Sequence, residues 1–242
     1  MQTSLTCPLF RTFAGAPGAG TARVWTISIW ILAGCDRALG GPGPIEQAPV
    51  APSPAAPLEQ PCPAEVPTPY ASDPRAQSAR LIVVFKSGFH EGFYSGGRLV
   101  SDEAGPLCFP VALGKRPQGP KTVKDNASTP EGWYHIAEKR DVGQTSFYRG
   151  FLVSYPNEAD ADRALALGVI SAGTHDSIVA ASRAGRLPSQ GTAMGGSILL
   201  HGLGSFPNNW TWGCVGADNE TMDVLFPRVR VGDPILIVPW AP

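Results

Sequence analysis

Short runs of apolar residues, separated by glycine and proline, dominate the chain from about residue 79 onward. Each run has the length of a strand, and Gly96 with Gly97 marks a turn inside the run 92–100. Many short strands with this punctuation predict a mainly β fold, a sandwich or a barrel. The expected strands lie within 81–85, 92–100, 107–113, 132–138, 151–155, 196–201 and 235–238.

Helix signals are few. Asn157 is a good cap for the alanine-rich segment 158–168, and a second helix is expected over 176–184. A third, short helix is expected over 219–226, with Asn219 as its cap. We therefore expect a few short helices beside a β-rich core.

The N-terminal segment has the pattern of an export signal. Arg11 and Arg23 precede the apolar run 24–33, which is too short to span a bilayer of about 30 Å but suits the core of a signal peptide. The run ends in Leu32-Ala33-Gly34-Cys35, which resembles the lipobox of bacterial lipoproteins. That resemblance implies a signal peptide over 1–34, cleavage before Cys35 and a lipid on Cys35.

The expected location is therefore the periplasm or cell envelope, with a lipid anchor in a membrane. An ordinary secretory signal, cut after a small residue, is the alternative. Inner versus outer membrane stays open, and so does the start codon, because the segment before Arg23 is long for such a signal.

A proline-rich segment follows the signal. Residues 35–78 are rich in proline, alanine and glycine, a composition that does not build a core of its own. Extended polyproline segments rise about 3.1 Å per residue, so this tether could reach on the order of 100 Å. We expect a passive spacer, followed by one domain over 79–242.

Charge and motifs exclude several classes of partner. The chain has 19 Lys and Arg against 20 Asp and Glu, so it has no basic excess that would favour nucleic acid. It contains no Cys-x-x-Cys, His-Glu-x-x-His, acidic calcium loop or phosphate-binding glycine motif. We expect a monomer without metal or cofactor.

Cysteine usage agrees with export. Cys7 would leave with the signal and Cys35 would carry lipid, so three cysteines remain in the mature chain. In an oxidising compartment, one pair and one free thiol is the simplest arrangement. We hypothesise a disulfide between Cys62 and Cys108 and a free Cys214; a mature chain with three thiols is the alternative.

The segment 196–219 contains the candidate chemistry. An apolar strand delivers His201 into a glycine-containing loop, which returns to Cys214. An imidazole that takes the proton of a thiol turns a weak nucleophile into a strong one. Gly213 allows close approach of a substrate to the backbone, where the amides of Gly213 and Cys214 could hold an oxyanion. By itself a Cys and His pair is more often structural than catalytic, so the context decides.

The context resembles the bacterial L,D-transpeptidase catalytic domain family. In that family a His-Gly precedes a Ser/Thr-x-Gly-Cys motif and an Asn-led helix. The matching residues are His201, Gly202, Thr211, Gly213, Cys214, Val215, Asn219, Met222 and Asp223. Four further signatures occur in the family's order, at 109–114, 119–121, 129–134 and 154–157, so that the resemblance covers about residues 80–239.

The resemblance implies a function. Cys214 would be the nucleophile and His201 the general base and acid, acting on peptidoglycan stem peptides through a thioester in cell-wall biogenesis. The acceptor stays open between a second stem peptide, another amine and water, which would make a carboxypeptidase or hydrolase. A noncatalytic wall-associated lipoprotein is the alternative from another class. Many members have a His before the Gly-Cys and an Arg or Asn after it, where this chain has Trp212 and Gly216.

Substrate-binding residues are less firmly indicated. We expect Trp212, Thr211, Ser205 and Tyr134 to contact the substrate, while Lys121 and Arg149 are either partners for its carboxylates or solvated charges. Trp210 and Trp212 could wall a groove or pack beneath the loop. The other histidines, His90, His135 and His175, are expected to have surface or capping roles.

Overall fold

The computed structural model describes residues 62–204 and 209–239. The signal, Cys35 and most of the predicted tether lie outside these residues, and so does Ser205. Within them, no helix is long and apolar enough to cross a membrane. The strands are β1 (Leu81–Phe85), β2 (His90–Ser95), β3 (Arg98–Leu99), β4 (Ser101–Asp102), β5 (Gly105–Pro106), β6 (Cys108–Pro110), β7 (Gly132–Arg140), β8 (Gly150–Val153), β9 (Leu199–His201), β10 (Val215–Gly216) and β11 (Pro234–Val238).

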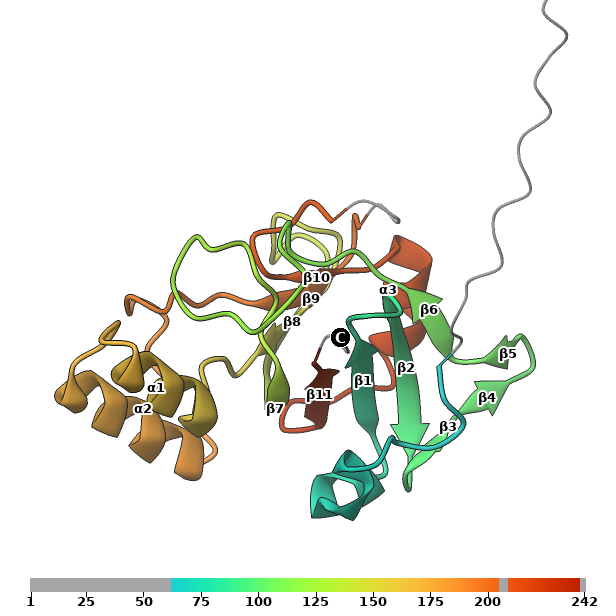
Figure 1. The fold of residues 1–242 in the computed structure, drawn as a ribbon. Helices are drawn as coiled ribbons and strands as arrows, with labels where there is room; N and C mark the ends of the chain where they lie inside the picture. Colours follow the sequence, from blue (N-terminus) through green and yellow to red (C-terminus); the bar gives the residue numbers. More distant parts are fainter. Residues whose placement is uncertain (1–61, 205–208, 240–242) are drawn as a thin grey trace, which may run out of the picture. The chain divides into compact units, whose positions relative to one another are not determined.

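A curled sheet forms the centre of the domain (Figure 1). Its strand order is β10-β9-β8-β7-β11-β1-β2-β3, with β6 paired to β2 and the hairpin β4-β5 forming a separate small sheet. The chain after β6 runs on to β10, where Ala112 and Gly216 exchange two backbone hydrogen bonds of 2.8 Å. This connection links the two ends of the curl. The mainly β fold expected from the sequence is confirmed.

Both faces of the central strands are buried, which explains their unbroken apolar runs. From β1, Ile82 and Val84 point into the main core, whereas Leu81 and Val83 point to a second, smaller cluster on the other face. Only continuous hydrophobic sequence, such as Leu-Ile-Val-Val-Phe, satisfies both sides of such a strand.

Within the described residues, three α-helices also contribute to the main core: α1 (Glu158–Ala166), α2 (Ala172–Arg183) and α3 (Asn219–Leu225). Asn157 caps α1 through a capping box with Asp160, as expected. Helix α2 begins four residues before the predicted start because Ser171 caps it. Helices α1 and α2 lie side by side (Figure 1).

The cap predicted for α3 is wrong. Asp218 is the N-cap residue and makes no side-chain cap bond, and Asn219 is the first residue of the helix. The Asn219 side chain instead accepts a hydrogen bond of 3.0 Å from the amide of Leu203. An Asn oxygen can serve a neighbouring loop as well as its own helix, and sequence alone does not distinguish the two.

The last part of the predicted tether is packed on the domain. Residues 62–78 contain the 3₁₀ helices η1 (Tyr70–Ser72) and η2 (Pro74–Gln77), and Val66 and Ala76 are buried in the second cluster. The proline-rich composition predicted only that this segment has no hydrophobic core of its own. In the structure, the segment packs into the second cluster beside the sheet.

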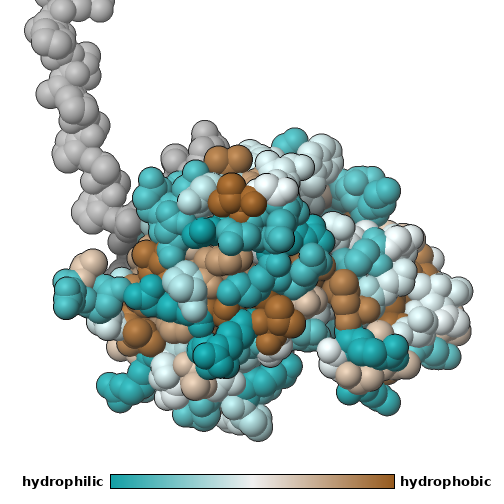
Figure 2. All heavy atoms as spheres, turned by 180° about the vertical axis from the view of Figure 1, so that it is seen from behind, coloured by the Kyte–Doolittle hydropathy of each residue, from teal (hydrophilic) through white to brown (hydrophobic). Residues whose placement is uncertain are grey.

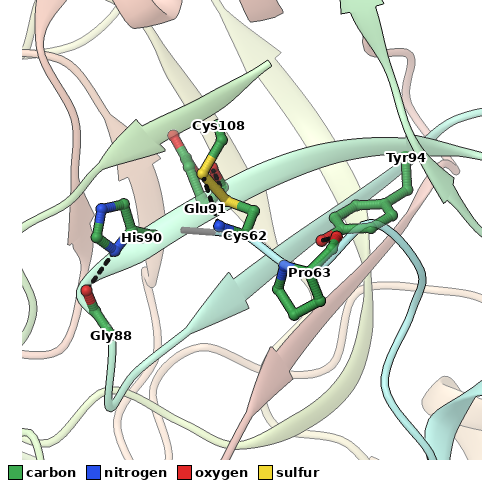
Figure 3. Close-up of a disulfide and its surroundings, with 7 residues drawn as sticks. All are labelled: Cys62, Pro63, Gly88, His90, Glu91, Tyr94 and Cys108. Carbon is green, nitrogen blue, oxygen red and sulfur yellow. Dashed lines mark hydrogen bonds between the residues drawn. A yellow bond between two sulfur atoms is a disulfide. The ribbon is translucent and has the colours of Figure 1, made fainter. Parts of the chain in front are cut away.

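The expected disulfide between Cys62 and Cys108 is present and fastens this segment to β6. Figure 3 shows the Cys62–Cys108 bridge, with the Tyr94 hydroxyl donating to the Pro63 carbonyl at 2.7 Å. The amide of Leu99 donates to the Ala64 carbonyl, which extends the edge of β3. On the face drawn in Figure 2, hydrophobic side chains form separate patches among polar ones.

Candidate active site

Two neighbouring strands carry the candidate catalytic residues. Strand β9 runs parallel to β10, with Leu200 opposite Val215 and His201 opposite Gly216. Leu200 and Val215 point into the main core. Because side chains alternate along a strand, His201 points to the other face, and so does Cys214, which directly precedes β10. His201 and Cys214 therefore lie on the same face of adjoining backbone segments.

His201 is fully buried and firmly oriented. Its Nδ1 lies 2.6 Å from the carbonyl oxygen of Gly202, which can only accept a hydrogen bond, so Nδ1 carries the proton. The Phe147 ring stacks on the imidazole with 3.6 Å between centroids and 14° between planes, and Trp210 meets it edge-on at 5.8 Å. Nε2 is left as an acceptor, with no partner among the described residues.

Burial lowers the pKa of His201, although the hydrogen bond to Gly202 acts in the opposite direction. The imidazole is therefore neutral at neutral pH and able to take a proton.

Cys214 is free and partly exposed. Its sulfur accepts a hydrogen bond of 3.5 Å from the amide of Leu199 and lies 3.8 Å from the carbonyl oxygen of Ser197. Burial raises the pKa of the thiol, against the lowering effects of the Leu199 amide and the charge of Lys121. The resting thiol is consequently protonated at neutral pH, so it needs a base before it can attack a carbonyl.

The turn before Cys214 is locked by Thr211. The Thr211 hydroxyl donates to the carbonyl oxygen of Cys214 at 2.7 Å and accepts from the amide of Gly213 at 3.2 Å. Gly213 has φ +126°, and a Cβ there would lie 2.7 Å from the Ser128 carbonyl oxygen, so only glycine fits. Thr211 is buried and thus shapes the turn, and the oxyanion role of the Gly213 amide stays a prediction.

The other predicted contacts fall in different places. Trp212 is 59% exposed and lines a cavity beside Cys214, with Lys115 above its ring at 4.3 Å. Tyr134 is buried, 2.8 Å from Asp160 Oδ2, and lines a separate cavity near η2. Arg149 is engaged by Asp141 at 2.8 Å and by Asp223 at 2.6 Å.

The remaining histidines are held by local partners or lie in the sheet. His175 bonds Asp162 and Asp176 on the helix pair, and the Nδ1 of His90 contacts the Gly88 carbonyl oxygen. His135 lies in β7. Within residues 62–204 and 209–239, no three His, Cys, Asp or Glu side chains gather as a metal site.

Sequence reasoning missed Phe147 as a partner of His201, and it left open which group orients the imidazole, with a backbone carbonyl as a plausible one; the structure shows the Gly202 carbonyl in that position. Phe147 lies 54 positions before His201 in a loop, and no periodic pattern marks such a contact. Gly202 was visible in the sequence, but only the structure shows why a glycine is needed there: a Cβ at Gly202 would lie 2.7 Å from Asn219 Oδ1.

Comparison with known proteins identifies the family of this domain. Residues 79–237 match the family described as L,D-transpeptidase catalytic domain (YkuD). The chain therefore belongs to the L,D-transpeptidase catalytic domain family. No curated protein matches the sequence.

Solved structures with a similar fold include three bacterial proteins. The L,D-transpeptidase of Xylanimonas cellulosilytica is 17% identical with a TM-score of 0.41, over 68% of this chain and 62% of that one. The helical cell shape determining protein Pgp2 of Campylobacter jejuni is 18% identical with a TM-score of 0.45, over 68% and 49%. L,D-transpeptidase 1 of Mycobacterium tuberculosis is 16% identical with a TM-score of 0.36, over 66% and 62%. The chain thus spans about half to three fifths of these structures.

Proposed function

We propose that this protein is a cysteine-dependent L,D-transpeptidase that acts on peptidoglycan stem peptides through a thioester on Cys214. The observation that carries the proposal is the placement of a neutral, buried imidazole with a free Nε2 on the same sheet face as the free thiol. Membership of the family supplies the substrate class.

In the first step, Nε2 of His201 takes the Cys214 proton as the sulfur attacks the carbonyl carbon of the third residue of a donor stem. A sulfur–carbon bond forms, and the carbonyl oxygen gains negative charge. In this step the Cys214 amide donates to the oxyanion. The Gly213 amide also donates to it once its bond to the Thr211 hydroxyl has broken. The carbon–nitrogen bond to the terminal D-alanine then breaks, and the leaving amine takes the proton from His201.

In the second step, a side-chain amine of a second stem attacks the thioester. His201 takes the amine proton, the sulfur leaves as thiolate and is reprotonated, and an amide cross-link remains. The Gly202 carbonyl and the Phe147 ring hold the imidazole in one tautomer and orientation throughout.

We further propose that the domain acts in the cell envelope, held by a lipid on Cys35 and a spacer of about residues 36–61. The packing of residues 62–78 on the sheet supports a spacer that ends at Cys62 rather than at residue 78.

Product analysis tests the proposal. Purified muropeptides with tetrapeptide stems are incubated with the protein or with Cys214→Ala, and products are resolved by mass. Cross-linked dimers and released D-alanine are expected from the parent alone. Trimmed monomers without dimers would make water the acceptor, and unchanged muropeptides would overturn the proposed activity.

A further inference from the structure

A cavity of about 350 Å³ opens beside the nucleophile, and nothing in the proposed mechanism uses it. It lies between the loop that contains Lys121 and Lys124 and the loop from Gln190 to Ser197. Ser197 joins it to the site, because its carbonyl oxygen is 3.8 Å from the sulfur of Cys214. Trp212, two residues before the nucleophile, forms another wall.

The cavity contains a buried cation. Lys121 is 3% exposed, and its Nζ donates to the Val123 carbonyl oxygen at 3.1 Å and to Asn126 Oδ1 at 3.3 Å. Both acceptors are neutral, and no ion pair involves Lys121 among the described residues. A buried charge without an ionic partner is unfavourable, and an ammonium has a third N–H to donate.

Glycines keep the opposite wall open. Gly195 has φ +80°, and a Cβ there would lie 3.5 Å from Lys121 Cε and 3.3 Å from Lys124 Cα. The side chain of any other residue at 195 would fill the space next to the ammonium. The small wall and the buried cation together form a recess for a compact anion.

The surroundings favour a negative ligand. Lys124 lines the same cavity, and Lys115 lies above the ring of Trp212, while Asp125 is the acidic residue among those that line it. Burial lowers the pKa of Lys121, whereas Asp125 and Cys214 act in the opposite direction. A carboxylate bound in the recess would raise the pKa of Lys121, as the charge of Asp125 does.

We propose that this recess binds the terminal carboxylate of the leaving D-alanine, with Lys121 as its cationic partner. The inference rests on the proposed function and adds how the donor is selected. In a donor tetrapeptide that carboxylate is separated from the attacked carbonyl only by the amide nitrogen and one Cα. It is therefore the substrate anion nearest to the attacked carbonyl, and the recess that contains Lys121 lies beside the sulfur through Ser197.

The role has a chemical consequence. A carboxylate held by Lys121 places the carbonyl of the third residue over Cys214 and selects stems that end one residue later. When the bond breaks, D-alanine leaves with its charge, and Lys121 no longer holds any part of the acyl-enzyme. The recess thus discriminates among donors and does not bind the thioester.

The test compares two donor peptides of one sequence, one ending in free D-alanine and one in D-alaninamide. For the parent, kcat/KM for release of the terminal residue is expected to be about ten- to a hundredfold higher for the free acid, mostly through KM. Lys121→Met should lose this preference, and Lys121→Arg should keep part of it. Arg116→Met, which removes an exposed cation that does not line the cavity, is the matched control and should keep it.

The outcomes are distinct. Equal kcat/KM for the two peptides in the parent overturns the inference without any variant, and so does a folded Lys121→Met protein that still prefers the acid. If Lys121 only stabilises the loop, Lys121→Met would lower kcat/KM for the two peptides by the same factor. If the parent releases the terminal residue from neither peptide, the proposed function itself is overturned, and the inference with it.

Discussion

At the residue scale, the proposed catalysis depends on how the His201 imidazole is held. His201 donates from Nδ1 to Gly202 and is covered by the ring of Phe147, so that Nε2 is the only nitrogen able to act as a base. Neither contact involves a charged group. Orientation here comes from a backbone carbonyl and an aromatic face, in place of the carboxylate found in many triads.

Replacing Phe147 should therefore impair catalysis more than folding. Phe147→Ala is expected to slow acylation of Cys214 about ten- to a hundredfold, because the imidazole loses its orientation. It should also shift the acid limb of the pH–rate profile to higher pH. Burial lowers the pKa of His201, and the variant admits water to the imidazole, which raises that pKa again. Phe147→Tyr keeps the ring and serves as the control. Single-turnover acylation rates across pH measure both effects, and an unchanged rate and profile in the alanine variant would contradict this role.

The resting state of the thiol gives a second prediction. Burial raises the pKa of Cys214. The rate of alkylation by iodoacetamide should therefore increase with pH and reach half of its maximum at a pH above the ordinary pKa of a thiol. Rates of mass gain over a pH series provide the measurement, with Cys214→Ala as the blank. A thiolate already formed at pH 7 would contradict the general-base mechanism.

Much of this residue-level arrangement was visible in the sequence, and part was not. His201 and Cys214 stand out because a strand, glycines and a turn surround them in one stretch. Tyr134 and Thr211 occur in motifs of the same kind, yet both are buried and bonded within the protein. Motif residues that shape a fold and those that touch a substrate look alike in sequence, because burial is decided by distant segments.

At the element scale, the proline-rich segment that ends at residue 78 divides into two parts. Its composition predicts no core, but Val66 and Ala76 pack against the outer face of β1, β2 and β11. The apolar side chains of these strands alternate between two clusters, so the second face needed a cover. The sequence showed the continuous apolar runs, whereas the identity of the covering segment depended on long-range packing.

Removing the disulfide should loosen that cover. The Cys62–Cys108 bridge spans 46 residues, and a loop of this length stabilises the folded state by about 2–4 kcal/mol. The paired variant Cys62→Ser with Cys108→Ser should melt at a lower temperature while Cys214 remains able to react, because the bridge is on a different part of the sheet. Calorimetry and intact mass after alkylation provide the two readouts. An unchanged melting temperature would show that packing alone holds the segment.

At the scale of the whole molecule, the core contains one unusual carboxyl group. Glu91 lies opposite Val84 on β1 and is fully buried, and neither of its oxygens has a partner among the described residues. Cross-strand neighbours share a face, so the side chain faces the main core as Val84 does. Burial raises the pKa of Glu91 to about 8.

Stability should therefore depend on pH in a defined direction. The unfolded chain releases the Glu91 proton near pH 4.5 and the folded protein near pH 8, so the folded state binds more protons between these values. The free energy of unfolding should fall as pH rises through this window, by up to about 1.4 kcal/mol per unit, and level off above it. Glu91→Gln cannot ionise and should lose this slope, whereas the exposed Glu65→Gln should keep it. Urea unfolding at several pH values measures the slope, and a parallel slope in Glu91→Gln would contradict the assignment.

In the proposed mechanism, Cys214 is the acylated nucleophile and His201 is its base. Intact-mass analysis after exposure to a carbapenem, a β-lactam acylating agent, tests both roles. The parent should gain the mass of one carbapenem, Cys214→Ala should gain none, and His201→Gln should gain it at least a hundredfold more slowly. An adduct that forms on Cys214→Ala, or that forms on His201→Gln at the parent's rate, would show that these two residues do not have the proposed roles.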